Sequence, residues 1–104
     1  MSITMRIIQR FNACHERDFM TLEAKFARLE AGRPDYPKGK RLQPISAGEP
    51  CNTLIWECEF PDLNSAQQAL DLFAGDSAHE ELIAQQLQFF EQVRVEFYKN
   101  LEFS

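Results

Sequence analysis

The chain has 104 residues, of which 44% are hydrophobic and 26% charged, and its 11 Lys and Arg against 16 Asp and Glu give a net charge of −5. This length supports one compact core, so we expect a single domain over residues 1–104. The acidic balance argues against nucleic acid and anionic membranes as partners, and no apolar run approaches the roughly 18 residues of a membrane span. No signal-peptide pattern is present, so we expect a cytoplasmic location.

The first elements along the chain are a strand and a helix. Residues 3–11 alternate apolar and polar positions, which predicts a half-buried strand. Residues 16–31 repeat apolar positions at spacings of three and four, which predicts a helix with one apolar stripe. Gly32 and the prolines that follow it predict the end of that helix.

The middle of the chain predicts a hairpin. Residues 40–46 read as a short strand, and Pro44 confines it to a sheet edge because proline has no amide donor. Residues 47–52 contain a Gly and a Pro and form the predicted connection. Residues 53–60 alternate clearly and give the strongest strand prediction, with Trp56 on the side that faces the core.

The C-terminal part predicts a broken helix and a last strand. Asn64 is a candidate N-cap for the first helical segment, which stops at residues 74–76. Ser77 and Glu80 form a second capping-box pattern, which predicts a helix that continues to about residue 90. Residues 92–98 alternate again and predict the final strand.

The predicted order βαββαβ indicates an α+β, ferredoxin-like fold. Right-handed crossovers in this arrangement place both helical segments on one face of a four-stranded antiparallel sheet. Strands 3–11 and 53–60 are then central, and strands 40–46 and 92–98 are edges. We expect the apolar positions of all four strands, including Val93, Val95 and Phe97, to pack against the helices.

The other sheet face carries an unusual mixture of charge and apolar surface. Two interpretations stay open: a solvated face with weak cross-strand ion pairs, or a face covered by a second sheet that encloses a partly polar cavity. Under the second interpretation guanidinium groups could anchor a planar acidic ligand, and a Tyr could donate to it. The candidate ligand-binding residues are Arg6, Arg10, Glu57, Glu59, Arg94, Glu96 and Tyr98.

Metal and thiol chemistry have little support in the sequence. Cys14, Cys51 and Cys58 are odd in number and lack CxxC spacing, which favours reduced thiols. The two histidines and the scattered carboxylates lack ligand spacing, so we expect no metal site. The isolated glycines form no phosphate-binding loop.

Four segments carry a resemblance to a known superfamily: residues 56–63 (WECEFPDL), 66–73, 76–79 (DSAH) and 94–98 (RVEFY). They combine a Trp-Glu-x-Glu-aromatic strand, a helix that opens after a polar turn, a second helix broken near an Asp, and an Arg-x-Glu final strand. In these features the chain resembles the dimeric α/β-barrel superfamily, most of all its NIPSNAP-like members. The resemblance implies that residues 1–104 form one such domain, a homodimer whose sheets meet face to face, with a pocket between each sheet and its helices or loops.

The resemblance leaves the reaction open, because this fold hosts unrelated chemistries. We expect a protein that binds a small aromatic or apolar-acidic molecule. An alternative is a cofactor-independent monooxygenase or isomerase in which His79, near the start of a helix, acts as the catalytic acid or base. A second alternative is a non-catalytic dimerisation module. We expect no resident cofactor; a haem would need His15 or His79 as its axial ligand.

Overall fold

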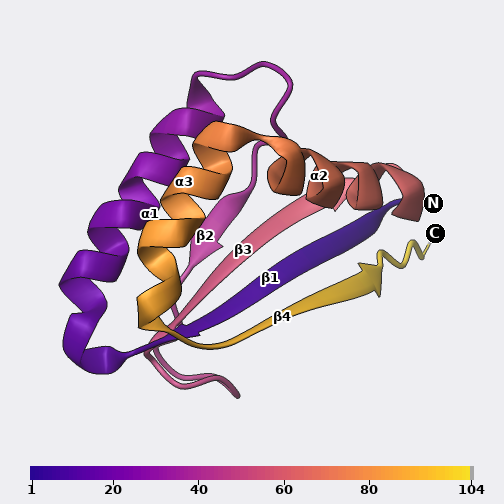
Figure 1. Cartoon of the computed structure of the whole chain (residues 1–104). Coiled ribbons are helices and arrows are strands. Elements are labelled where there is room, and N and C mark those ends of the chain that lie inside the picture. The colour runs from indigo at the N-terminus through magenta and orange to yellow at the C-terminus, as the bar shows by residue number, and fades with distance from the viewer. Residues whose placement is uncertain (104) are drawn as a thin grey trace.

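The computed structural model describes residues 1–103, which form a four-stranded sheet and a layer of helices on one of its faces (Figure 1). The elements are β1 (Ile3–Phe11), the 3₁₀ turn η1 (Ala13–His15), α1 (Glu16–Ala31), β2 (Lys40–Leu42), β3 (Thr53–Phe60), α2 (Leu63–Gly75), α3 (Ser77–Gln86), the 3₁₀ turn η2 (Leu87–Phe89) and β4 (Phe90–Lys99). Among these residues no helix is both long and apolar enough to cross a membrane.

The sheet has the strand order β2-β3-β1-β4, with every neighbouring pair antiparallel. This confirms the ferredoxin-like α+β prediction, with β1 and β3 central. The register places Ile7 opposite Trp56 on one side and Val95 on the other. Because side chains alternate along a strand, odd-numbered β1 residues face the helices and even-numbered ones face away.

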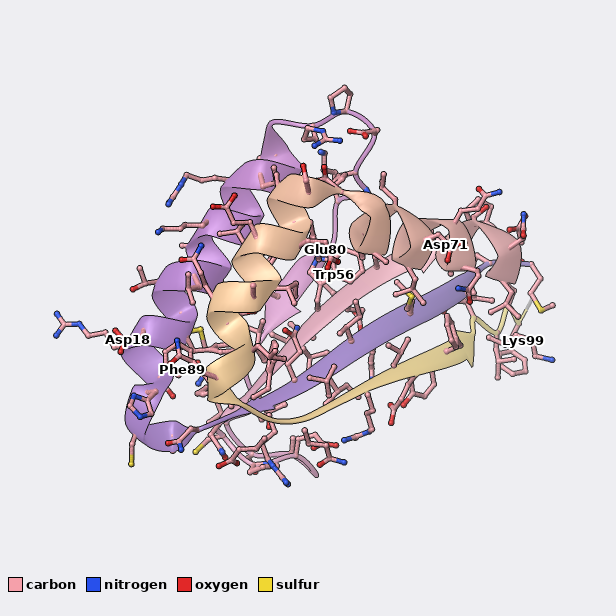
Figure 2. All side chains as sticks on the ribbon, viewed as in Figure 1. Asp18, Trp56, Asp71, Glu80, Phe89 and Lys99 are labelled. Carbon is pink, nitrogen blue, oxygen red and sulfur yellow. The ribbon has the colours of Figure 1, made fainter. Side chains whose placement is uncertain are left out.

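The core lies between the sheet and the helices. Phe19, Leu22 and Phe26 of the predicted α1 stripe are buried. Trp56 is only 4% exposed and lies beneath the helices, whereas Asp18 points into solvent from the outer side of α1 (Figure 2). The predicted core position of Trp56 is therefore confirmed.

The helix-facing side of β4 differs from the prediction. Val93, Val95 and Phe97 are 48%, 39% and 42% exposed, so the expectation that they pack against the helices was wrong. The physical reason is the strand's place at the edge of the sheet, beyond the area that the helices cover (Figure 1). Periodicity identifies the face of a strand but not how far the opposing layer extends.

The observed ends of several elements differ from the predicted ends by a few residues. β2 stops at Leu42, so Pro44 lies beyond the strand that was expected to contain it. The carboxylate of Asp62, rather than the side chain of Asn64, caps α2 by accepting from the Ser65 amide. Helix α3 ends at Gln86, and η2 then leads into β4 two residues earlier than expected.

Candidate functional site

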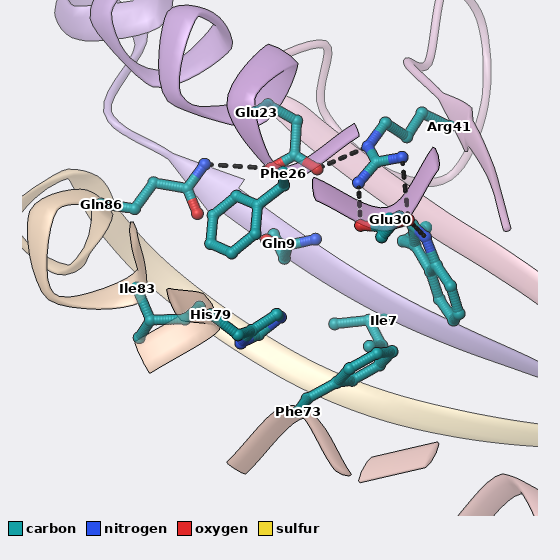
Figure 3. Close-up of a pocket in the computed structure, with 11 residues that line it drawn as sticks. Ile7, Gln9, Glu23, Phe26, Glu30, Arg41, Phe73, His79, Ile83 and Gln86 are labelled. Atoms are coloured by element: carbon teal, nitrogen blue, oxygen red, sulfur yellow. Dashed lines mark hydrogen bonds and ion pairs between the residues drawn. The ribbon is translucent and has the colours of Figure 1, made fainter. Parts of the chain in front are cut away.

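A partly open cavity of about 80 Å³ lies between the sheet and helices α1 and α3 (Figure 3). Three strands and three helices contribute to it, and its walls combine aromatic rings with buried polar groups. The lining residues are Ile7, Gln9, Glu23, Phe26, Glu30, Arg41, Trp56, Phe73, His79, Ile83 and Gln86. Of the residues predicted as functional from the sequence, His79 is the one that the structure brings to this cavity.

His79 lies in the first turn of α3 between two phenylalanine rings. Its ring stacks on Phe73 at 4.9 Å between centroids and 6° between planes, and its centroid is also 4.9 Å from Phe26. Burial lowers the pKa of His79, because the cavity wall disfavours the imidazolium more than the nearby carboxylates favour it. Its Nδ1 atom is buried and has no hydrogen-bond partner within residues 1–103.

Glu23, Glu30 and Arg41 form a buried charged cluster on the opposite wall. Arg41 Nε donates to Glu23 Oε2 at 2.6 Å, and Arg41 Nη2 donates to Glu30 Oε2 at 2.6 Å. The two carboxylate side chains are only 8% exposed. Trp56 Nε1 donates to Glu30 Oε1 at 3.1 Å, and Gln86 Nε2 donates to Glu23 Oε1 at 3.0 Å. This network extends along one side of the cavity and fixes the side chains that form it.

The charges of this cluster do not balance. Two carboxylates face one guanidinium, so the cluster carries a formal charge of −1 beside the cavity. A buried ionic group is tolerated only when hydrogen bonds satisfy its oxygens, and the contacts above do this. The cavity therefore disfavours an anionic occupant.

The break between α2 and α3 is held by the loop that follows α1. Asp76 lies at the break and accepts hydrogen bonds from the Tyr36 hydroxyl and from Arg33 Nη1. The Tyr36 bond contributes most to lowering the pKa of Asp76. Asp76 is the residue before α3, so these contacts fix the start of the helix that carries His79.

The seven sheet-face residues lie on the opposite side of the sheet and do not line the cavity. Several are paired with one another: Arg6 Nε donates to Glu57 Oε1 at 2.7 Å, and Arg94 Nε donates to Glu96 Oε2 at 2.8 Å. Tyr98 donates to Glu96, and its ring lies under the Arg6 guanidinium. A ligand on this face would have to compete with these pairs, and ligand binding there stays a prediction.

The remaining sheet-face positions have different surroundings. Arg10 lies 3.5 Å from Glu91, which the sequence did not single out, and Glu59 is exposed. Ile8 is only 4% exposed although it points away from the helices, and the register places it between Ile55 and Arg94 of the neighbouring strands. This face is thus a polar ladder around a small apolar centre.

The sequence interpretation missed the buried polar residues of the cavity. Glu23 and Glu30 are seven residues apart and share the α1 stripe with Phe19 and Phe26, so their spacing could have shown that they point inward. His79 and Gln86 are also seven apart on α3. Arg41 gives a weaker signal, since its orientation follows from the register with β3.

The expectations of no metal site and no resident cofactor stay predictions. No group of three or more potential ligands occurs within the described chain, residues 1–103. His15 lies in η1 and is exposed, with its ring 5.3 Å from that of Phe89. The cavity beside His79 is far smaller than a tetrapyrrole ring, so its residues do not fit a haem.

Comparison with known proteins identifies the fold. No protein-family model and no curated protein matches the chain. Among solved structures, a NIPSNAP family protein from Agrobacterium tumefaciens superposes with a TM-score of 0.80 at 13% identity, covering 100% of this chain and 97% of that one. A NIPSNAP domain protein from Burkholderia xenovorans gives 0.79 at 14% identity, covering 100% and 98%.

An enzyme is also among the structural neighbours. SnoaB, a cofactor-independent oxygenase from Streptomyces nogalater, superposes with a TM-score of 0.65 at 11% identity, covering 98% of this chain and 95% of that one. At these identities the likeness concerns the fold and not the reaction. The chain thus has the fold that these NIPSNAP proteins and SnoaB share, in agreement with the resemblance seen in the sequence.

Proposed function

We propose that this protein binds a small, uncharged aromatic molecule in the cavity beside His79. The observation that carries the proposal is the pair of buried polar atoms, His79 Nδ1 and Gln86 Oε1, that line an aromatic-walled cavity without a partner in residues 1–103. Buried polar groups are nearly always hydrogen-bonded, so unpaired ones at a cavity favour an occupant that pairs with them. Of the two ligand types expected from the sequence, the −1 cluster supports the aromatic one over the acidic one.

The cavity volume limits the size of the ligand. At about 80 Å³ it is roughly half the volume of an apolar cavity known to hold benzene, which measures about 150 Å³. A single ring therefore requires a lining side chain to move, and the candidate is Ile83, a partly exposed lining residue of α3. A fused polycyclic molecule would need a larger rearrangement.

Phenol is a suitable probe for this proposal. If phenol binds the native state, a concentration ten times its dissociation constant raises the free energy of unfolding by about 1.4 kcal/mol and the melting temperature by about 6–11 °C. The variant Ile83→Phe fills the cavity and should lose this response. The matched control Ala84→Phe places the same ring on an exposed neighbouring position and should keep it. Equal responses in both variants would show that phenol binds elsewhere.

A catalytic role for His79 is the second candidate function. The lowered pKa keeps the His79 ring neutral near pH 7, and its free Nδ1 can accept a proton from a bound hydroxyl or activated carbon. Proton removal is the first step both of an isomerisation and of a reaction in which the resulting anion is oxidised by O₂. The fold shared with a cofactor-independent oxygenase supports testing the second reaction.

The test of this candidate compares turnover with binding. His79→Phe keeps the stack with Phe73 but removes both nitrogens, so it should abolish oxygen uptake with a quinol. Phenol should still bind, because it can donate to the remaining acceptor, Gln86 Oε1. Glu81→Gln changes an exposed residue of the same helix and should leave uptake unchanged. Uptake that survives in His79→Phe would remove the catalytic role and leave a binding protein.

We also propose that a second copy of this chain covers the open sheet face. The partly exposed side chain of Ile55 and the half-exposed ring of Tyr98 support an interface there. Ile55→Lys should convert a dimer into a monomer in light scattering. Val93→Lys, on the helix side of β4, should have no such effect. A wild-type protein that is monomeric at micromolar concentration would contradict the proposal.

A further inference from the structure

The side chain of Gln86 has an unusual position for an amide. It is fully buried at the end of α3, and its Nε2 group donates to Glu23 Oε1 at 3.0 Å and to the Phe19 carbonyl oxygen at 3.4 Å. Its Oε1 atom has no partner in the described part of the chain, and the residue lines the cavity (Figure 3). One half of the amide is thus tied to α1, and the other half is left free.

The orientation of this amide is fixed by its neighbours. Glu23 can only accept hydrogen bonds while it is ionised, and the Phe19 carbonyl can only accept. Turning the Gln86 amide over would place Oε1 against these two acceptors and remove the donor that Glu23 Oε1 has in Gln86 Nε2. Arg41 Nε holds the other Glu23 oxygen at 2.6 Å, so the carboxylate cannot rotate away. Gln86 therefore keeps Oε1 as its free atom.

We propose that Gln86 Oε1 is a specificity-determining acceptor that selects ligands carrying an O–H or N–H donor, and that Glu23 is the positioning residue that sets this polarity. The inference deepens the proposed binding function and rests on it. A ligand without a donor leaves Oε1 buried and unpaired, which costs affinity. An anionic ligand meets the same acceptor together with the −1 charged cluster. The cavity then discriminates by hydrogen-bond polarity and not by shape alone.

Pyrrole and furan test this inference because they share a five-membered ring and differ in the N–H donor. Binding of each is measured by NMR titration of the amide signals of cavity residues. In the wild type, pyrrole should bind about 10- to 100-fold more tightly than furan, since one buried hydrogen bond accounts for that ratio. Equal affinities for pyrrole and furan would overturn the inference; this is the result expected if a bound water donates to Oε1. The proposed binding function would still stand. Failure of both probes to bind would overturn the inference and the proposed function together.

Two variants separate the roles of the two residues. Gln86→Met keeps the length of the side chain without its acceptor and should bind pyrrole and furan equally. Glu23→Gln introduces an amide that can donate to Gln86 Oε1, which lets the Gln86 amide turn and present its NH₂ group to the cavity. The preference for pyrrole should then be lost, whereas a merely structural role of Glu23 would weaken both probes alike. If Gln86→Met fails to fold, the ratio of pyrrole to furan affinity in the wild type and in Glu23→Gln still tests the inference.

Discussion

Replacing Arg41 with Met should destabilise the protein severely. Arg41 is the one cation against the two carboxylates of Glu23 and Glu30, whose side chains are 8% exposed, and it reaches both with bonds of 2.6 Å. Removing one partner from a buried ionic cluster costs about 3–5 kcal/mol because the remaining charge is uncompensated. A domain of this size has about 5–15 kcal/mol in total, so the melting temperature should fall by at least about 12 °C.

The assay is urea unfolding monitored by tryptophan fluorescence. Trp56 is the single tryptophan, is buried, and donates to Glu30, so its emission reports on this cluster. Arg94→Met, which breaks partly exposed pairs on the sheet face, is the control and should shift the urea midpoint much less. A loss of stability below about 1 kcal/mol for Arg41→Met would refute the reasoning.

Three further outcomes follow from the structure. Folding lowers the pKa of His79, so the wild type should lose stability as the pH falls below the unfolded-state pKa of about 6.5. His79→Phe should lose less stability between about pH 7.5 and about pH 5.5, as measured by the urea midpoint. Gly39→Ala would place a Cβ 2.2 Å from Trp56 Cε2, so calorimetry should show a loss of about 1–3 kcal/mol, while Gly48→Ala, with nothing within 4 Å, should be neutral. Tyr36→Phe removes the hydroxyl bond at the α2–α3 break, and amide exchange should show faster opening of the α3 start.

The strands and the first helix could be predicted because their signals are local. Alternation over residues 3–11 and 53–60 and the α1 stripe agree with the observed bounds, and Gly32 ends α1 as expected. The ends of β2 and of α3 were missed for the opposite reason. Strand β2 has only three residues paired with β3, and α3 tightens into a 3₁₀ turn where the chain enters β4. Both features depend on tertiary pairing that periodicity does not encode.

The cavity was only half predictable. His79 could be singled out from its place near a helix start and from the family resemblance, but its aromatic surroundings come from α1 and α2. Glu23 and Glu30 were not among the predicted site residues, because charged residues are rarely buried unless paired and the sequence does not show their partner. Their partner, Arg41, reaches them only because β2 lies at the sheet edge nearest to α1. The composition of a buried ionic cluster is thus fixed by topology, although its helical spacing is visible in the sequence.

Strand β1 serves two surfaces with alternate residues, which gives a last prediction. Ile7 and Gln9 line the cavity, whereas Arg6 and Ile8 belong to the open sheet face, so a second copy on that face would not touch the cavity. Ligand binding and self-association should therefore be independent. The affinity for phenol, measured over about a hundredfold range of protein concentration, should stay constant although the oligomeric state changes. An affinity that rises with protein concentration would mean that the second copy completes the cavity, because linkage requires association and binding to strengthen each other equally.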